Sequence, residues 1–112
     1  MDKIAEARRW SNYTVIISII FQTNMNDGVC TLIIDLATDE RPGSKAISMK
    51  FVGVSNLKLG EIGGGISQFC RLDVVDIRDK QWDRLNYRVW DYETERIEFM
   101  CRSFEIEKEY TI

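Results

Sequence analysis

Histidine is absent from the 112 residues of this chain. It is the commonest general base, a usual metal ligand and the partner of most serine and cysteine nucleophiles, so its absence argues against most hydrolytic mechanisms. Cysteine is scarce and unpaired: Cys30, Cys70 and Cys101 lie in apolar runs and form no CxxC motif. We therefore predict reduced thiols, and neither a disulfide framework nor a zinc site.

Other reactive residue types are present, but not in arrangements that perform chemistry. A glycosidase needs two carboxyl groups that face each other across a cleft, whereas Asp73 and Asp76 lie among basic residues in segments that we interpret as solvated. Without a histidine base, Cys70 and Cys101 would need an electropositive pocket to become nucleophiles, and their strand phasing favours small buried hydrophobes instead. We expect no enzyme activity, no cofactor and no metal site.

The chain also lacks a basic excess and a long apolar run. Its net charge is −3 and its pI is about 5.0, whereas a nucleic-acid binder normally shows a basic face, so a basic protein is the better partner. The apolar stretch Tyr13–Phe21 contains Thr14 and Ser18 and is shorter than the roughly 20 residues that cross a bilayer. We expect neither a membrane span nor a signal peptide, and a cytoplasmic location.

Alternating apolar residues are the main positive signal. They predict seven strands with short connections, in a single domain over residues 1–112 that begins with a short helix or an ordered arm at Met1–Trp10. The fold class is mainly β, α+β at most, with antiparallel strands in a sandwich or an open barrel. The strands are expected at Tyr13–Phe21, Val29–Leu36, around Ile47–Phe51, around Leu57–Leu59, and at Phe69–Ile77, Leu85–Asp91 and Arg96–Ile106.

Details of the pattern predict where strands bend, turn and are buried. Both faces of Tyr13–Phe21 are apolar, which indicates a central strand covered on both sides. Asp27 followed by Gly28 is typical of a tight hairpin, and Gly53 marks a bulge or bend. The alternation changes phase near Val74 and again near Ser103, which predicts a bulge or slip at each.

Aromatic and acidic residues gather in two late turns. Trp90 and Tyr92 fall on the face opposite Leu85, Tyr87 and Val89, so they either pack under a second sheet or are displayed to a partner. If both turns lie at the same end of the sheet, acidic side chains surround the aromatic ones and form a patch that attracts a basic protein. The predicted partner-binding residues are Asp79, Trp82, Asp83, Trp90, Asp91, Tyr92, Glu93 and Glu95.

Three segments carry a family resemblance. The run Ile47–Leu59, with its pattern F-x-G-V-x-x-L-x-L, and the later segments Tyr87–Val89 and Ile97–Ile106 resemble the small bacterial immunity proteins of polymorphic toxin systems, and in particular the immunity protein 50 family. This resemblance implies a non-enzymatic cytoplasmic protein that binds and blocks the C-terminal domain of a cognate toxin. It further implies a nuclease as the toxin and a contact-dependent growth inhibition system as the setting.

Other functions fit the residues taken alone. A small-ligand-binding β module would have a cavity between its sheets, with the Gly63–Gly65 loop as a lid. That loop lacks the Lys-Ser/Thr step of a phosphate-binding loop and is expected to be a hairpin or connecting loop. A small hydrolase, or a subunit of a larger assembly with an exposed apolar patch, are further alternatives.

Overall fold

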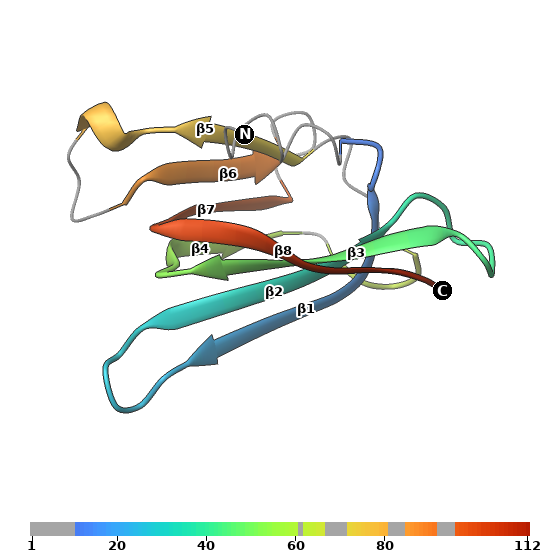
Figure 1. Ribbon diagram of the computed structural model, residues 1–112, viewed down its shortest axis with the longest axis horizontal. Coiled ribbons are helices and arrows are strands. Elements are labelled where there is room, and N and C mark those ends of the chain that lie inside the picture. The colour runs from blue at the N-terminus through green and yellow to red at the C-terminus, as the bar shows by residue number, and fades with distance from the viewer. Residues whose placement is uncertain (1–10, 61, 67–71, 81–84, 92–95) are drawn as a thin grey trace.

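The computed structural model describes residues 11–60, 62–66, 72–80, 85–91 and 96–112 (Figure 1). The helix or arm predicted at Met1–Trp10 lies outside these residues. Eight strands and one short 3₁₀ helix, η1 (Arg78–Lys80), make up the regular structure of the described chain. The strands are β1 (Val15–Thr23), β2 (Cys30–Ala37), β3 (Lys45–Val52), β4 (Ser55–Leu59), β5 (Leu72–Asp76), β6 (Tyr87–Asp91), β7 (Ile97–Cys101) and β8 (Ser103–Thr111).

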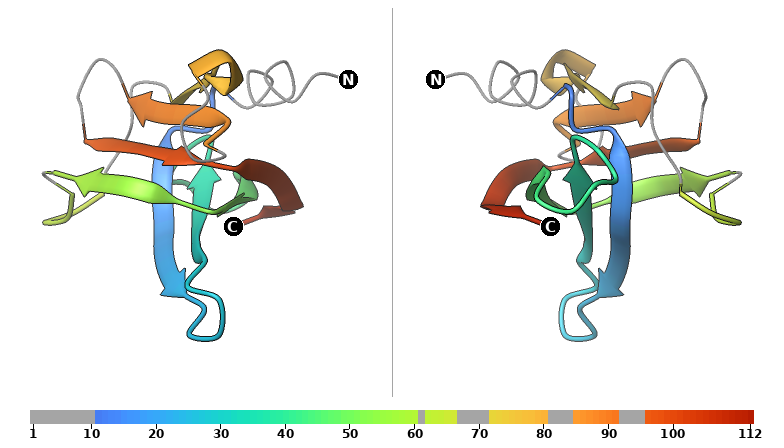
Figure 2. Two further views of the ribbon diagram at one scale, coloured as in Figure 1. Left: turned by 90° about the vertical axis from the view of Figure 1, so that its left-hand side faces the viewer. Right: turned by 90° about the vertical axis from the view of Figure 1, so that its right-hand side faces the viewer.

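The strands form two antiparallel four-stranded sheets. The first sheet has the order β1-β2-β3-β8 and the second has the order β4-β7-β6-β5. Figure 2 shows that the β1–β2 hairpin runs across the direction of β4, β6 and β7, so the two sheets are crossed and not aligned. The prediction of a mainly β, antiparallel sandwich is confirmed.

The chain passes twice between the sheets, and both passages lie side by side. β3 continues into β4 through Gly53, and β7 continues into β8 through Arg102. The backbone N–H of Arg102 donates to the carbonyl of Val52 over 3.0 Å, which joins the two passages. The bend predicted at Gly53 is confirmed by its φ of 70°, and the slip predicted near Ser103 is the point where the chain changes sheet.

The inner faces of the two sheets pack together. Phe51 of the first sheet meets Phe99 of the second edge to face, with ring centroids 4.9 Å apart, and Phe104 meets Tyr87 in the same way at 5.0 Å. Leu32, Ile34 and Leu36 complete the wall from β2, as their alternation predicted, and are at most 1% exposed. Burial of this apolar surface is the main force that holds the sheets together.

The prediction that the first strand is central is wrong. β1 is an edge strand, and its Ile17, Ile20 and Phe21 are 43%, 45% and 48% exposed. The register with β2 shifts between Ile16 and Ser18, so the alternation read from the sequence breaks at this bulge. The turn predicted at Asp27 is confirmed: its carboxylate accepts from the N–H of Val29, and Gly28 has a φ of 74°.

Two later predictions also need correction. The bulge expected near Val74 is not found, because β5 pairs with β6 in an unbroken register from Leu72 to Asp76. Ile77 is buried because it lies beyond the end of β5, where the chain turns into η1, and not because the strand slips. The last strand extends to Thr111, beyond the predicted end at Ile106.

Candidate partner-binding site

Strand β6 places two of the predicted binding residues on opposite faces. Tyr87, Val89 and Asp91 point inward, and Asp91 is 0% exposed. Arg88 and Trp90 point outward, so Trp90 does lie opposite Tyr87 and Val89, as the alternation predicted. Because its side chain is fully buried, Asp91 is not available to a partner.

The end of β5 and the end of β6 lie at opposite ends of the second sheet. In the antiparallel pairing of β5 with β6, Asp76 is opposite Tyr87 and Leu72 is opposite Asp91. The described Asp79 follows β5 in η1, on the side where β6 begins, whereas Asp91 ends β6 on the other side. Of the acidic residues predicted to form a joint patch, the described Asp79 and Asp91 are therefore apart, and the others lie outside the described residues.

Of the remaining predicted binding residues, one is exposed on the surface and five lie outside the described residues. Asp79 is exposed in η1. Next to this helix, the Arg78 side chain donates hydrogen bonds that lower the pKa of Asp76, and the backbone N–H of Arg78 adds another at 2.9 Å. Five residues lie outside the described chain: Trp82, Asp83, Tyr92, Glu93 and Glu95.

On the outward side of β6, Arg88 organises a small group of side chains. Its guanidinium carbon lies 4.3 Å from the ring centroid of Trp90, in a cation–π arrangement. The same guanidinium donates to the Glu98 carboxylate of the neighbouring strand, over 3.1 Å from Nε and 2.8 Å from Nη2. Arg88 is therefore held between an aromatic ring and a carboxylate, which limits its rotamers.

Strand pairing extends this group across the whole sheet. Glu98 is opposite Lys58 of β4, Arg88 is opposite Met100 of β7, and Trp90 is opposite Asp73 of β5. We call the outward-pointing side chains of the second sheet the outer face. They are Asn56, Lys58, Asp73, Val75, Arg88, Trp90, Glu98 and Met100.

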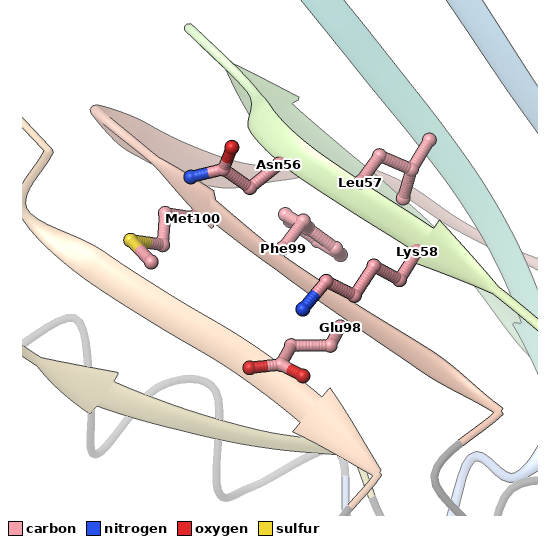
Figure 3. A pocket seen from close by; sticks show the side chains of 6 residues that line it. All are labelled: Asn56, Leu57, Lys58, Glu98, Phe99 and Met100. Atoms are coloured by element: carbon pink, nitrogen blue, oxygen red, sulfur yellow. The ribbon is translucent and has the colours of Figure 1, made fainter.

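A pocket of about 240 Å³ opens in the outer face between β4 and β7 (Figure 3). The pairing of these strands shifts between Ser55 and Lys58, and Asn56 adopts a φ of 57°, which is rare for a residue other than glycine. The residues that line the pocket are Asn56, Leu57, Lys58, Glu98, Phe99 and Met100, of which Phe99 is 0% exposed and packs inward against Phe51. A pocket of this kind can receive one side chain of a partner.

The chemistry of the outer face suits binding. Trp and Arg are enriched among residues that dominate protein interfaces, and here they are stacked and already ordered. The charges balance, with Lys58 and Arg88 against Asp73 and Glu98. Within the described residues no group of three or more potential metal ligands occurs.

Sequence reasoning proposed Trp90 and did not propose the residues around it. The alternation in Tyr87–Asp91 and Ile97–Cys101 places Arg88 with Trp90 and Glu98 with Met100, a signal that was present in the sequence. The contact between Arg88 and Glu98 depends on the β6–β7 register, which sets Arg88 opposite Met100 and Trp90 opposite Glu98. The pocket depends on the irregular pairing of β4 with β7, which no residue pattern in the sequence predicts.

Comparison with known proteins identifies the family. The family model described as Immunity protein PIM8 matches residues 1–107, nearly the whole chain. No curated protein and no solved structure matches the chain significantly. No helix within the described residues is long and apolar enough to cross a membrane. The resemblance to bacterial immunity proteins is confirmed at the level of an immunity protein, and the chain belongs to the Immunity protein PIM8 family.

Proposed function

We propose that this immunity protein neutralises a cognate toxin by binding the toxin's C-terminal domain in a tight, stoichiometric complex, without catalysis. The family match over residues 1–107 supports the immunity role. Strong inhibition by binding alone requires an ordered surface, because every side chain that must be immobilised on association lowers the affinity. The sandwich core supplies that rigid support.

The outer face is the surface that we assign to the toxin. The observation that carries this assignment is the Arg88 guanidinium stacked on Trp90 and bonded to Glu98, next to the pocket between β4 and β7. A toxin side chain would enter the pocket between β4 and β7, while Trp90 and Arg88 would contact the surrounding toxin surface. Such a central anchor with aromatic and arginine neighbours is the usual composition of an interface hot spot.

We further propose that the toxin is a nuclease and that the pair acts in bacterial contact-dependent growth inhibition. A nuclease needs a basic surface for the phosphate backbone, and a partner with a net charge of −3 would be attracted to it. The protein would act in the cytoplasm, where the toxin meets its target. Because the outer face is charge-balanced, the acidic attraction would speed encounter, whereas packing on the outer face would determine the lifetime of the complex.

The ligand-binding alternative has less support. It requires a cavity between the sheets, and the described side chains there pack against each other: the ring centroid of Phe51 lies 4.9 Å from that of Phe99 and 6.0 Å from that of Phe104. The pocket between β4 and β7 opens outward on the surface.

Co-expression tests the proposal. The chain is produced together with the toxin domain encoded beside it, and growth, co-purification and toxin activity on DNA and RNA are measured. We expect restored growth, a one-to-one complex and loss of nuclease activity when equimolar protein is added. Failure to bind or to restore growth contradicts the immunity role for that toxin, while binding to a toxin without nuclease activity contradicts only the toxin class.

A further inference from the structure

Strand β1 differs from the other edge strands of the described sheets. The four edges are β1 and β8 in the first sheet and β4 and β5 in the second. β4 contains Lys58, β5 contains two aspartates and β8 contains three glutamates and a lysine, whereas β1 contains no charged residue. Charged side chains on an edge prevent pairing with other chains, so β1 lacks a common form of protection.

The exposed part of β1 is also regular and apolar. After the bulge between Ile16 and Ser18, the pairing with β2 runs unbroken from Ser18 to Thr23. Ile20 and Phe21 lie in this regular part, on opposite faces, and are 45% and 48% exposed. Figures 1 and 2 show that the β1–β2 hairpin projects away from the second sheet, which leaves this edge accessible.

Backbone groups of β1 point toward the open edge at every second residue. The N–H of Asn24 donates to the carbonyl of Val29 over 2.9 Å, which marks that pair as hydrogen-bonded. Hydrogen-bonded and non-hydrogen-bonded pairs alternate in an antiparallel ladder. The register therefore directs the N–H and C=O groups of Ile19, Phe21 and Thr23 away from β2, in the spacing that another strand would need.

We propose that β1 pairs with β1 of a second copy of this chain, about a twofold axis, to form a continuous eight-stranded sheet in a homodimer. Two copies of one strand related by a twofold axis are antiparallel by symmetry, and they present the same surface to each other. A second copy matches the neutral, apolar character of this edge, because the pairing sets no like charges opposite each other. A basic toxin surface would find no carboxylate on β1 to bind.

The dimer and the proposed toxin complex use different surfaces. Pairing at β1 uses an edge of the first sheet, whereas the outer face belongs to the second sheet. Each copy would then bind one toxin domain, giving a complex of two immunity proteins and two toxins. The inference is independent of the toxin's identity.

Sedimentation equilibrium of the purified chain from low micromolar to near-millimolar concentration tests the dimer. We expect the mass of the wild type to rise with concentration from 13.1 kDa toward twice that value. The mass of Ile20→Lys and of Phe21→Lys should stay at the monomer value, half that of the dimer. Val75→Lys is the matched control, since Val75 is 39% exposed on another edge strand and should leave the dimer intact. Circular dichroism establishes that each variant is folded.

Three results would overturn the dimer. These are a monomeric wild type throughout the concentration range, a dimer that survives both β1 lysines, and equal dissociation by Val75→Lys. A monomeric wild type whose β1 variants lose toxin binding would show that the toxin pairs with this edge instead. Toxin binding by Arg88→Ala is measured in parallel. An unchanged affinity would contradict the outer face as the toxin surface and would say nothing about the dimer mass, so the two proposals fail separately.

Discussion

The side chain of Arg102 lies directly against the Cα of Gly53. A Cβ atom on Gly53 would come within 2.6 Å of the Arg102 side-chain carbons Cγ and Cδ, closer than real Cβ contacts allow. Gly53 also has a φ of 70°, a conformation that side chains with a Cβ disfavour. Glycine at this position therefore lets the two passages between the sheets run in contact without displacing the Arg102 side chain.

Replacement of this glycine should destabilise the fold. In Gly53→Ala the left-handed backbone conformation costs about 1–2 kcal/mol, and displacement of the Arg102 side chain adds to this. Urea unfolding followed by tryptophan fluorescence measures the free energy of unfolding. Gly28→Ala is the matched control, because Gly28 has a φ of 74° but open space around its Cβ position.

We expect Gly53→Ala to lose more stability than Gly28→Ala, and the additional Arg102→Ala substitution to recover part of the difference. Equal losses in the two glycine variants would mean that Arg102 moves aside freely and that only backbone conformation matters at Gly53.

How far the sequence predicts this fold depends on whether a feature is local. Leu32, Ile34 and Leu36 alternate strictly, and the structure buries all three. At β1 the same reasoning failed, because the bulge between Ile16 and Ser18 changes the phase and because edge position depends on which strands pair. Because both faces of β1 are apolar, the sequence indicates a central strand, whereas the β1–β2 hairpin projects away from the second sheet.

The candidate site shows the same division. Trp90 was predicted from residue type and alternation, and the same alternation sets Arg88 beside it on β6. The ion pair of Arg88 with Glu98 arises from pairing between β6 and β7. Asp91 was predicted to bind a partner because it is charged and close to a turn. It is buried because it continues the inward alternation of Tyr87 and Val89.

A hydrogen-bonded trio on the outward side of the first sheet should contribute to stability. Asp35 accepts from the Ser48 hydroxyl over 2.8 Å and from the Tyr110 hydroxyl over 2.5 Å, which joins β2, β3 and β8. Hydrogen bonds to charged groups contribute about 1.5–3 kcal/mol, so Tyr110→Phe should lower the free energy of unfolding by about that amount. A double-mutant cycle with Asp35→Asn tests the pairing, and strictly additive losses would show that the two residues do not interact.

The same tyrosine predicts a pH dependence at alkaline pH. Burial, followed by the hydrogen bond and negative charge of Asp35, raises the pKa of Tyr110 from 10.0 to about 12. Between these values the unfolded chain loses this proton while the folded chain retains it, so unfolding becomes easier as pH rises. The stabilisation is complete below pH 10 and is lost as pH approaches 12.

Urea unfolding at a series of pH values from 8 to near 12 measures this effect. Because other groups titrate in the same range, the informative quantity is the difference between wild type and Tyr110→Phe. We expect this difference to shrink as pH rises above 10. A difference that stays constant with pH would mean that Tyr110 ionises equally easily in both states.

The last prediction concerns the outer face and the toxin. Removal of a hot-spot side chain costs at least 2 kcal/mol, about thirtyfold in Kd, and we expect a loss of this size for Trp90→Ala. Arg88→Ala should weaken binding in the same direction, because it removes the guanidinium that covers Trp90 and leaves Glu98 unpaired. Lys50→Ala is the control, since Lys50 also forms a cross-strand ion pair, with Glu107, but on the first sheet.

Titration calorimetry with the isolated toxin domain gives the Kd of each variant, and urea unfolding separates binding from stability. Exposed ion pairs contribute little to folding, so Arg88→Ala and Lys50→Ala should unfold within about 1 kcal/mol of wild type. If Lys50→Ala weakens toxin binding as much as Trp90→Ala does, the toxin binds the first sheet. The β1 edge would then be the place to look for that contact, because it belongs to the same sheet and carries exposed Ile20 and Phe21.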